Sequence, residues 1–300
     1  MTPNENQELY VWIDGELLNK ERAAVSVWDH GFLYGDGVYE GIRSYAGAVH
    51  RLDDHIERLF ESAKSIQIDI QYSQAQIGRA VGETLLKNSL FEDAHVRIVA
   101  TRGVGKPGLD PRRAVKSTTI VMSYPFPKYF GEKAVRLLIS SVRKKSPYSV
   151  DAKLKSLNYM DSVLAKLQAN AAQMDDAILL DMSGYVAEAT GMNVFVVKDN
   201  KISVPTTGAS LEGITRKVVL EIASRLGFSV AETNITPHDL YVADEAFLTG
   251  TGAGIVPIDE VDGRKVGKGA RIVLKRILEE YTRDIHDNSV NASDIVKKYT

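Results

Sequence analysis

Lys155 stands between a strand-like run and a helical run, in the sequence Lys155-Ser156-Leu157-Asn158-Tyr159. An amine held in a cleft at such a junction loses water, and this loss favours its neutral, nucleophilic form. Most lysines are instead solvated surface residues, and Lys144, Lys145 and Lys153 lie close by in the sequence. From spacing alone, a surface position remains the simpler interpretation for Lys155.

Glu188 is a single carboxylate among small and apolar residues, shortly before the strand-like residues 193–197. Because a glutamate is almost never buried without a partner, a buried Glu188 requires a cation. Arg58 lies near the apolar edge of an amphipathic helix and could reach inward to an anion. Glu188 and Arg58 are therefore candidates for ionic roles in an interior site.

Two glycine-containing segments have the composition of anion sites. In Gly250-Thr251-Gly252-Ala253-Gly254, small residues can expose successive backbone N–H groups, and Thr251 adds a hydroxyl. A sharp chain reversal that requires glycine explains the same residues equally well. Gly213-Ile214-Thr215 begins an expected helix, whose N-terminus can bind phosphate. Most helix N-termini bind only water or a capping side chain, so this second signal is weak by itself.

A third glycine segment, Gly103-Val104-Gly105-Lys106-Pro107-Gly108, matches the spacing of a dinucleotide-binding fingerprint. That fingerprint needs a strand before it and a helix directly after it. A strand-like run precedes the segment, but Pro107 lies inside it and Leu109-Asp110-Pro111 follows, which cannot begin such a helix. We therefore interpret residues 103–111 as a long, turn-rich loop.

The elements that must position these residues follow from alternating periods of two and about 3.6 residues. Strands are expected at residues 10–13, 41–45, 95–101, 117–124, 135–142, 177–181, 193–197 and 246–249, and helices at 51–66, 73–88, 159–172, 213–227 and 269–286. This mixture favours two α+β domains over one doubly wound parallel sheet. Residues 124–131 are rich in proline and glycine, so we expect a small N-terminal domain (1–124), an interdomain loop (125–133) and a larger C-terminal domain (134–300).

Composition excludes several classes of protein. The chain has 300 residues, a formal net charge of −2 and no cysteine, which excludes disulfide frameworks, thiolate metal sites and thiol nucleophiles. The balanced charge gives no basic surface for nucleic acid. The polar residues 1–8 do not resemble a secretory signal, and no apolar run is long enough to span a membrane, so we expect a cytoplasmic protein.

Six motifs then follow one another in a characteristic order, at residues 34–43, 55–59, 155–159, 188–195, 211–216 and 250–253. Together they resemble the class IV, fold-type IV aminotransferases that use pyridoxal 5'-phosphate (PLP), over residues 10 to about 267. The resemblance implies the two-domain α+β fold of the D-amino acid aminotransferase type, with the cofactor between the domains. It also implies at least a homodimer, in which a loop of the partner closes each site.

The resemblance assigns a role to each ambiguous residue above. Lys155 would form the internal aldimine with the cofactor and then move a proton between Cα and C4′. Glu188 would pair with the protonated pyridine nitrogen, which keeps the ring an electron acceptor, and Tyr159 would bond its phenolic oxygen. The groups expected to hold the phosphate are Arg58, the backbone of Ile214 and Thr215, and Thr251.

Within this family, the loop after residue 103 separates the subfamilies. D-amino acid aminotransferases typically have an Arg-x-His carboxylate trap there, which this chain lacks; its glycine-rich loop ending in Leu109-Asp110-Pro111-Arg112 resembles the branched-chain enzymes. We therefore expect ping-pong transamination between branched-chain L-amino acids (Leu, Ile, Val) and 2-oxoglutarate. The alternatives are a D-amino acid or (R)-amine transaminase and, less favoured, an aminodeoxychorismate lyase.

The resemblance also implies a substrate pocket walled by aromatic side chains, with an arginine for the distal carboxylate of glutamate. The matching residues are Tyr34, Tyr39, His95, Arg97, Tyr129, Gly252 and Ala253. Two features depart from the branched-chain pattern. His95-Val96-Arg97 replaces Tyr-x-Arg, and the Ser-Leu-Asn after Lys155 is also common in D-specific enzymes. With a period of two, His95 shares the face of Arg97, and an imidazole there makes a roomier, more polar wall that can titrate near neutrality. A structural histidine is the other interpretation of His95.

Overall fold

A computed structural model describes residues 8–127, 129–131, 133–206, 208–267 and 269–299 of the chain. These form two compact units. The first contains residues 1–127, 154–158 and 287–300, and the second contains residues 128–153 and 159–286. The change between units after Pro127 falls inside the loop expected at residues 125–133. Residues 154–158 and the C-terminal tail, however, join the first unit rather than the expected C-terminal domain.

The first unit is built on a seven-stranded sheet in the order β16-β4-β3-β5-β6-β1-β2, in which every neighbouring pair is antiparallel. Its strands are β1 (Tyr10–Ile13), β2 (Glu16–Asn19), β3 (Gly37–Tyr45), β4 (Ala48–His50), β5 (Ala94–Gly105), β6 (Ala114–Pro125) and β16 (Ser289–Asn291). An antiparallel sheet has no parallel βαβ unit, so the glycine segment at 103–108 is not a dinucleotide fingerprint.

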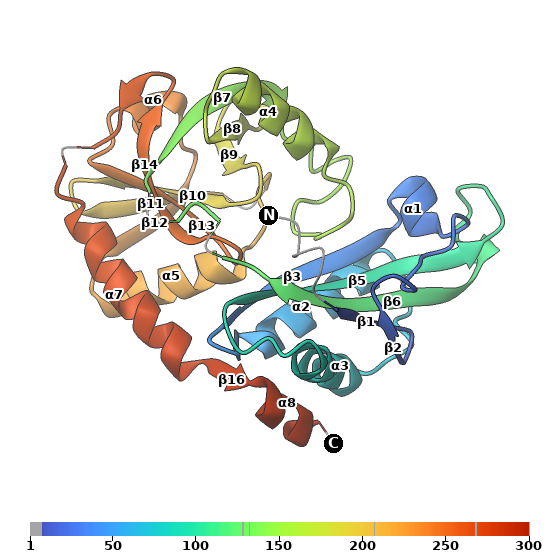
Figure 1. The fold of residues 1–300 in the computed structure, drawn as a ribbon. Helices are drawn as coiled ribbons and strands as arrows, with labels where there is room; N and C mark the ends of the chain where they lie inside the picture. Colours follow the sequence, from blue (N-terminus) through green and yellow to red (C-terminus); the bar gives the residue numbers. More distant parts are fainter. Residues whose placement is uncertain (1–7, 128, 132, 207, 268, 300) are drawn as a thin grey trace. The chain divides into compact units, whose positions relative to one another are not determined.

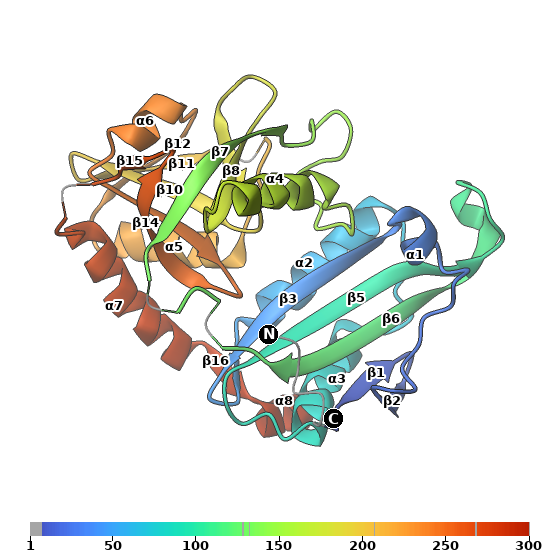
Figure 2. The same cartoon turned by 45° about the horizontal axis from the view of Figure 1, so that its top comes forward.

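Two amphipathic helices cover one face of this sheet (Figure 2). The helical segments of the unit are α1 (His30–Tyr34), α2 (Leu52–Ser65), α3 (Gln74–Lys87), the short 3-10 helix η1 (Pro111–Arg113) and α8 (Ala292–Lys298). Ser73 and Gln76 form a capping box that begins α3 where the sequence predicts its start. The core consists of buried aliphatic side chains from both layers, among them Ile42, Ile56, Leu59, Ile77, Val96 and Ile98.

The C-terminal tail belongs to this unit because of close packing that its polar composition conceals. Strand β16 extends the sheet beside β4, and α8 packs against α3. Gly78 and Gly82 make the helix contact possible: a Cβ atom on Gly78 would lie 2.4 Å from the Tyr299 ring, and one on Gly82 would lie 2.8 Å from Val296. Larger residues at these two positions would therefore displace the tail.

The second unit contains a nine-stranded mixed sheet in the order β12-β11-β10-β13-β14-β7-β8-β9, with β15 paired to β14. Its strands are β7 (Val135–Arg143), β8 (Asp176–Leu180), β9 (Val186–Ala189), β10 (Asn193–Lys198), β11 (Lys201–Pro205), β12 (Ser229–Thr233), β13 (Glu245–Gly250), β14 (Gly254–Val261) and β15 (Arg264–Lys265). Strand β7 is parallel to both of its neighbours, and β11 is parallel to β12.

Four helices flank this sheet: α4 (Met160–Ala171), α5 (Ile214–Arg225), α6 (Pro237–Tyr241) and α7 (Ile272–Asp287). Helices α5 and α7 share one face of the sheet (Figure 1). There they pack on the stacked rings of Phe195 and Phe247, whose centroids are 4.8 Å apart. Helix α4 packs against β7 and β8 and directly follows Tyr159. Two antiparallel or mixed sheets with flanking helices confirm the α+β class.

Each strand and helix expected from periodicity is present, with ends shifted by a few residues. The sequence patterns do not predict the short elements α1, α6, α8, β9, β11 and β12, nor the longer strand β14. Within the part of the chain that is described, no helix combines the length and apolar character needed to cross a bilayer. Residues 1–7, expected not to form a secretory signal, lie outside the described residues.

Candidate active site

Lys155 lies in a segment that runs beside β3 in the first unit. Its carbonyl oxygen accepts from the backbone N–H of Tyr39 at 3.0 Å, and the N–H of Leu157 donates to the carbonyl of Gly37 at 2.9 Å. The N–H of Lys155 itself meets the hydroxyl of Ser62 on α2 at 3.4 Å. These bonds hold the backbone on both sides of Lys155, so the half-buried side chain projects from a fixed point.

Tyr39 brings Lys155 and Arg97 together. The Nζ atom of Lys155 lies 4.6 Å from the centroid of the Tyr39 ring, and Cζ of Arg97 lies 4.1 Å from the same centroid. Val96 and Ile98 on β5 are fully buried, whereas His95 and Arg97 are only partly buried. This alternation confirms that His95 and Arg97 share a sheet face. We call Lys155, Tyr39, His95 and Arg97 the Tyr39 cluster.

His95 packs among aromatic rings at one end of the cluster. Its ring centroid lies 5.4 Å from that of Tyr124 and 5.1 Å from that of Phe126. Burial, reinforced by the nearby charge of Arg97, lowers the pKa of His95 to about 4. His95 is therefore neutral at physiological pH, and the expectation that it titrates near neutrality is wrong. Its buried Nδ1 has no hydrogen-bond partner among the described residues.

Arg58 is held by a carboxylate of its own unit. Its Nε and Nη2 atoms donate to the two oxygens of Glu40 at 2.7 and 2.8 Å, and Nδ1 of His55 lies 2.7 Å from Oε2 of Glu40. Glu40 is fully buried; burial opposes its charge, but Arg58 and His55 outweigh burial and lower the pKa of Glu40 to about 2. A bidentate pair of this kind fixes the plane of the guanidinium group.

Glu40 and His55 are residues that sequence reasoning missed. Val38, Glu40 and Ile42 alternate on the core face of β3, and His55 lies on the buried face of α2 between Leu52 and Ile56. A carboxylate at a core position of a strand needs a buried cation. A charged residue at a core position of the period-two pattern is the signal from which this ion pair could be predicted.

In the second unit, Glu188 is a buried residue of β9 and forms an ion pair with Lys144 of the same unit. Nζ of Lys144 lies 2.8 Å from Oε1 of Glu188. The backbone N–H of Leu211 donates to Oε2 of Glu188 at 3.0 Å. Tyr159, the residue before α4, lies next to the same lysine, with its ring centroid 5.6 Å from Nζ of Lys144. The sequence indicates Lys144 only as a competitor of Lys155.

Lys153 differs clearly from Lys155. Its side chain is 55% exposed and forms an ion pair with Glu212 at 2.9 Å. This is a surface arrangement of the kind that contributes little to stability. Of these two lysines, only Lys155 belongs to the Tyr39 cluster.

No side chain of the N-cap residue caps the N-terminus of α5. Gly213 is the N-cap residue and provides no side chain to cap the helix, while Ile214 and Thr215 at the first positions are buried. A Cβ atom at position 213 would lie 2.2 Å from Oδ1 of Asn193, so a larger residue there would displace the Asn193 side chain. The backbone N–H groups of a helix N-terminus carry partial positive charge and suit an anion.

The segment Gly250–Gly254 is a hairpin turn between β13 and β14, in which Gly250 pairs with Gly254. A sharp reversal therefore accounts for its glycines, and Thr251, Gly252 and Ala253 form the turn. Asn193 pairs with Thr249 at the start of this turn and donates to the carbonyl of Leu211 at 2.8 Å. Within the second unit, Glu188, the α5 N-terminus and this turn are thus joined by direct contacts.

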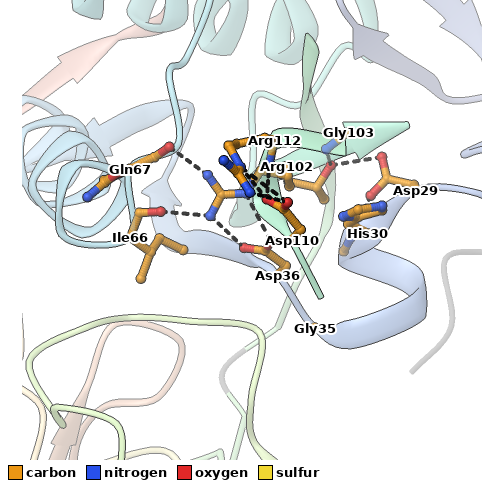
Figure 3. A network of polar contacts seen from close by, with 12 residues as sticks. Asp29, His30, Gly35, Asp36, Ile66, Gln67, Arg102, Gly103, Asp110 and Arg112 are labelled. Carbon is orange, nitrogen blue, oxygen red and sulfur yellow. Dashed lines mark hydrogen bonds and ion pairs between the residues drawn. The ribbon is translucent and has the colours of Figure 1, made fainter. Parts of the chain in front are cut away.

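The glycine-rich loop at residues 103–113 is the end of the β5–β6 hairpin and is tied to α1. The hydroxyl of Tyr34 accepts from the N–H of Gly108 at 2.8 Å, and Nε2 of His30 lies 3.1 Å from the carbonyl of Lys106. Arg102 anchors the base of the hairpin through Asp36 and through the backbone carbonyls of Ile66 and Gln67 (Figure 3). The hydroxyl of Tyr34 therefore helps to hold this loop against α1.

Tyr129 belongs to the second unit, where its side chain is 59% exposed and its ring lies edge-on to Phe130 at 4.7 Å. Among the described residues, no group of three or more His, Asp or Glu side chains is arranged to hold a metal ion.

Comparison with known proteins identifies the family. Residues 37–261 match the family described as Amino-transferase class IV. The chain belongs to the class IV aminotransferases. A Methanocaldococcus jannaschii class IV relative, whose name provisionally calls it a branched-chain-amino-acid aminotransferase, is 46% identical over 276 residues, which cover 92% of this chain and 96% of that protein.

Two solved structures of aminotransferases are similar over nearly the whole chain. One is a branched-chain aminotransferase from Thermoproteus uzoniensis with norvaline: TM-score 0.90, 36% identity, covering 95% of this chain and 99% of that one. The other is a branched-chain amino acid aminotransferase from a T.th. strain, complexed with N-(5'-phosphopyridoxyl)-L-glutamate: TM-score 0.90, 34% identity and the same coverage. These similarities confirm the fold-type IV resemblance stated from the motifs.

Proposed function

We propose that this aminotransferase uses PLP to exchange amino groups between branched-chain L-amino acids and 2-oxoglutarate in a ping-pong reaction. The observation that carries the proposal is the TM-score of 0.90 with branched-chain enzymes, one bound to norvaline and one to a phosphopyridoxyl-glutamate adduct. Those two ligands represent the two substrate types that one site must accept, an apolar amino acid and glutamate.

The residues present suit PLP. A lysine fixed by its backbone, a buried carboxylate and an uncapped helix N-terminus match the aldehyde, pyridine nitrogen and phosphate of this cofactor. We propose that Lys155 binds it covalently, Glu188 pairs with its ring nitrogen and Tyr159 bonds its phenolic oxygen. The phosphate ligands would be Arg58, the backbone N–H groups of Ile214 and Thr215, and Thr251. When bound, PLP supplies an electron sink for the substrate's Cα.

Lys155 has the chemistry to move the proton of the reaction. With cofactor and substrate bound, the free amine of Lys155 would take the proton from the substrate's Cα and return it to C4′ of the cofactor. The backbone bonds of Lys155 to Tyr39 and Ser62 fix the start of its side chain, which limits the directions from which the amine can act. The proton transfer therefore occurs on one defined side of the substrate.

For the substrate, we propose that Tyr34, Tyr39, His95 and Arg97 of the first unit, and Tyr129, Gly252 and Ala253 of the second, are binding residues. Tyr39 offers an aromatic surface to an apolar side chain, and the guanidinium of Arg97 beside it can pair with the distal carboxylate of glutamate. A neutral His95 with an unpartnered Nδ1 adds polarity where a tyrosine is usual in the branched-chain pattern. This substitution favours side activity with D-alanine or (R)-amines.

A screen of amino donors tests the proposal. Purified protein loaded with PLP is assayed with L-leucine, D-alanine and (R)-1-phenylethylamine, with 2-oxoglutarate as acceptor. We expect L-leucine to be the best donor and to bleach the visible band of the bound cofactor. A preference for D-alanine or the (R)-amine would instead assign the alternative subfamily, and no reaction with any donor would refute the proposed activity.

We also propose that the enzyme is a homodimer or a higher homo-oligomer, with the dimer as the simplest form. Trp28 and Phe32 around α1 are 54% and 71% exposed, and Leu109 and Val115 on the β5–β6 hairpin are 84% and 94% exposed. Large exposed apolar side chains that gather in one region mark an association surface. Light scattering should give the mass of two or more chains, and a double substitution, Phe32→Glu with Leu109→Glu, should reduce it to one. A monomeric parent protein would refute this assignment.

We further propose that the protein works in the cytoplasm. A chain without cysteine needs no oxidising compartment for its folding. Fractionation of cells that express the protein should find it with cytoplasmic markers, and recovery with membranes or outside the cell would contradict the proposal.

A further inference from the structure

Lys144 is a buried ammonium group whose three donors face three acceptors of the second unit. Its Nζ atom lies 2.8 Å from Oε1 of Glu188 and 3.4 Å from Oδ2 of Asp161, and it donates to the hydroxyl of Ser162 at 3.3 Å. Only 3% of the side chain is exposed. Because an ammonium group has three donors and no acceptor, this arrangement fixes where the charge of Lys144 lies.

Glu188 is consequently held from two directions. Lys144 occupies one carboxylate oxygen, and the backbone N–H of Leu211 occupies the other at 3.0 Å. A carboxylate offers about four acceptor positions, so the two fixed donors determine the plane of the group and the directions that stay open. The orientation of the Glu188 carboxylate is therefore set by Lys144, just after β7, and by Leu211, shortly before α5, as well as by β9 itself.

We propose that Lys144 is a positioning residue that orients Glu188 toward the pyridine nitrogen of PLP and places a fixed positive charge beside it. This inference rests on the proposed function, in which Glu188 pairs with that nitrogen. A proton shared by Glu188 and the ring can lie on the carboxylate or on the nitrogen. A fixed positive charge beside Oε1 favours the carboxylate form, so the proton stays on the nitrogen, where it makes the ring a better electron acceptor.

Lys144 keeps its positive charge in this buried position. Burial opposes it, but Glu188 and Asp161 outweigh burial and raise the pKa of Lys144 above its ordinary value. Without Lys144, Glu188 would lose its ion pair and keep the backbone N–H of Leu211 as a donor. A buried carboxylate that loses its ion-pair partner is strongly destabilised.

Lys145 offers a matched control in the adjacent position. Its Nζ atom lies 5.5 Å from the Tyr159 ring centroid, against 5.6 Å for Lys144. Burial, with the nearby charge of Lys144, lowers the pKa of Lys145, although the charges of Asp161 and Glu188 oppose this shift. Lys145→Met therefore removes a lysine equally close to Tyr159 and leaves the Lys144–Glu188 pair in place.

The experiment compares the parent, Lys144→Met, Lys144→Arg and Lys145→Met, each loaded with PLP labelled with ¹⁵N in the ring. The ¹⁵N chemical shift reports whether the ring nitrogen is protonated, and single-turnover rates with L-leucine report the chemistry. In Lys144→Met we expect the shift to move toward the unprotonated value and the rate to fall by roughly tenfold or more. Lys144→Arg should restore both quantities, and Lys145→Met should resemble the parent. If Lys144→Met does not fold, Lys144→Gln takes its place.

Two results would overturn the inference. One is a protonated ring nitrogen in Lys144→Met, with a rate close to that of the parent. The other is an equal loss of rate in Lys144→Met and Lys144→Arg without any change in the ¹⁵N shift, which would mean a purely structural role. The parent separates this test from the proposed function: if the parent does not bind PLP or react with L-leucine, the proposed function itself fails.

Discussion

Acidification should destabilise the first unit through His95. The pKa of His95 is about 4 in the folded protein because of burial and Arg97, against an ordinary value of 6.5. Between these two values the unfolded chain binds a proton that the folded chain excludes. Stability must therefore fall as pH falls through this window. A histidine paired with a carboxylate has a raised pKa and would instead make the folded protein more stable as pH falls.

The size of the effect follows from the two pKa values. At about 1.4 kcal/mol per pKa unit, the whole window corresponds to about 3 kcal/mol, and about 2 kcal/mol of it falls between about pH 7 and about pH 5. The stabilising contribution of Glu40 to the folded unit is lost only at lower pH, because the pKa of Glu40 is about 2 against an ordinary value of 4.5. His55 also has a lowered pKa, mainly through burial, so the contribution of His95 must be isolated by substitution.

Urea unfolding followed by tryptophan fluorescence provides the assay. Both tryptophans, Trp12 and Trp28, belong to the first unit, and Trp12 is buried in its core beside Tyr72. The measured transition therefore reports the unit that contains His95. Between about pH 7 and about pH 5, His95→Gln should lose about 2 kcal/mol less stability than the parent. His238→Gln, at an exposed position of α6, should behave like the parent. Equal losses in the parent and His95→Gln would refute the reasoning.

Three further substitutions test the site. Glu188→Gln should lower the half-reaction rate by several orders of magnitude while the cofactor still attaches; turnover within a few-fold of the parent would show that the ring is not tuned from this position. Glu40→Gln should weaken PLP binding to the apo-protein by about tenfold or more, because the guanidinium of Arg58 loses the bidentate partner that fixes its plane, whereas Glu57→Gln on the exposed face of α2 should bind normally. His95→Tyr should reduce activity with D-alanine and (R)-amines relative to L-leucine, and an unchanged donor profile would place His95 outside the pocket.

Local sequence patterns predict most of the longer elements, with β14 as an exception. The helix at residues 73–88 has its start encoded in the Ser73 and Gln76 capping box, and the expected strand ends likewise fell close to the observed ones. The C-terminal tail was not predictable in this way, because its structure depends on residues far away in the sequence. Strand β16 needs β4 as a partner, and α8 needs the space above Gly78 and Gly82.

In the candidate site, too, local motifs could be predicted from the sequence, whereas contacts between distant residues could not. The order of the motifs led to Lys155, Glu188 and Arg58, but not to the residues that hold two of them. Glu40 and Lys144 are each far in sequence from the residue they pair with, and a periodic pattern does not record such pairs. Glu188 was expected to need a cation; which cation it has could be read only from the fold.

The central claim is that Lys155 is the residue that carries the cofactor, and borohydride reduction followed by peptide mass mapping tests it most directly. Reduction fixes PLP to its lysine as a stable phosphopyridoxyl group, so one map of the parent protein distinguishes Lys155 from Lys144, Lys145 and Lys153. We predict that the modified peptide contains the phosphopyridoxyl group on Lys155 alone. Modification of Lys144, Lys145 or Lys153 instead would contradict the account.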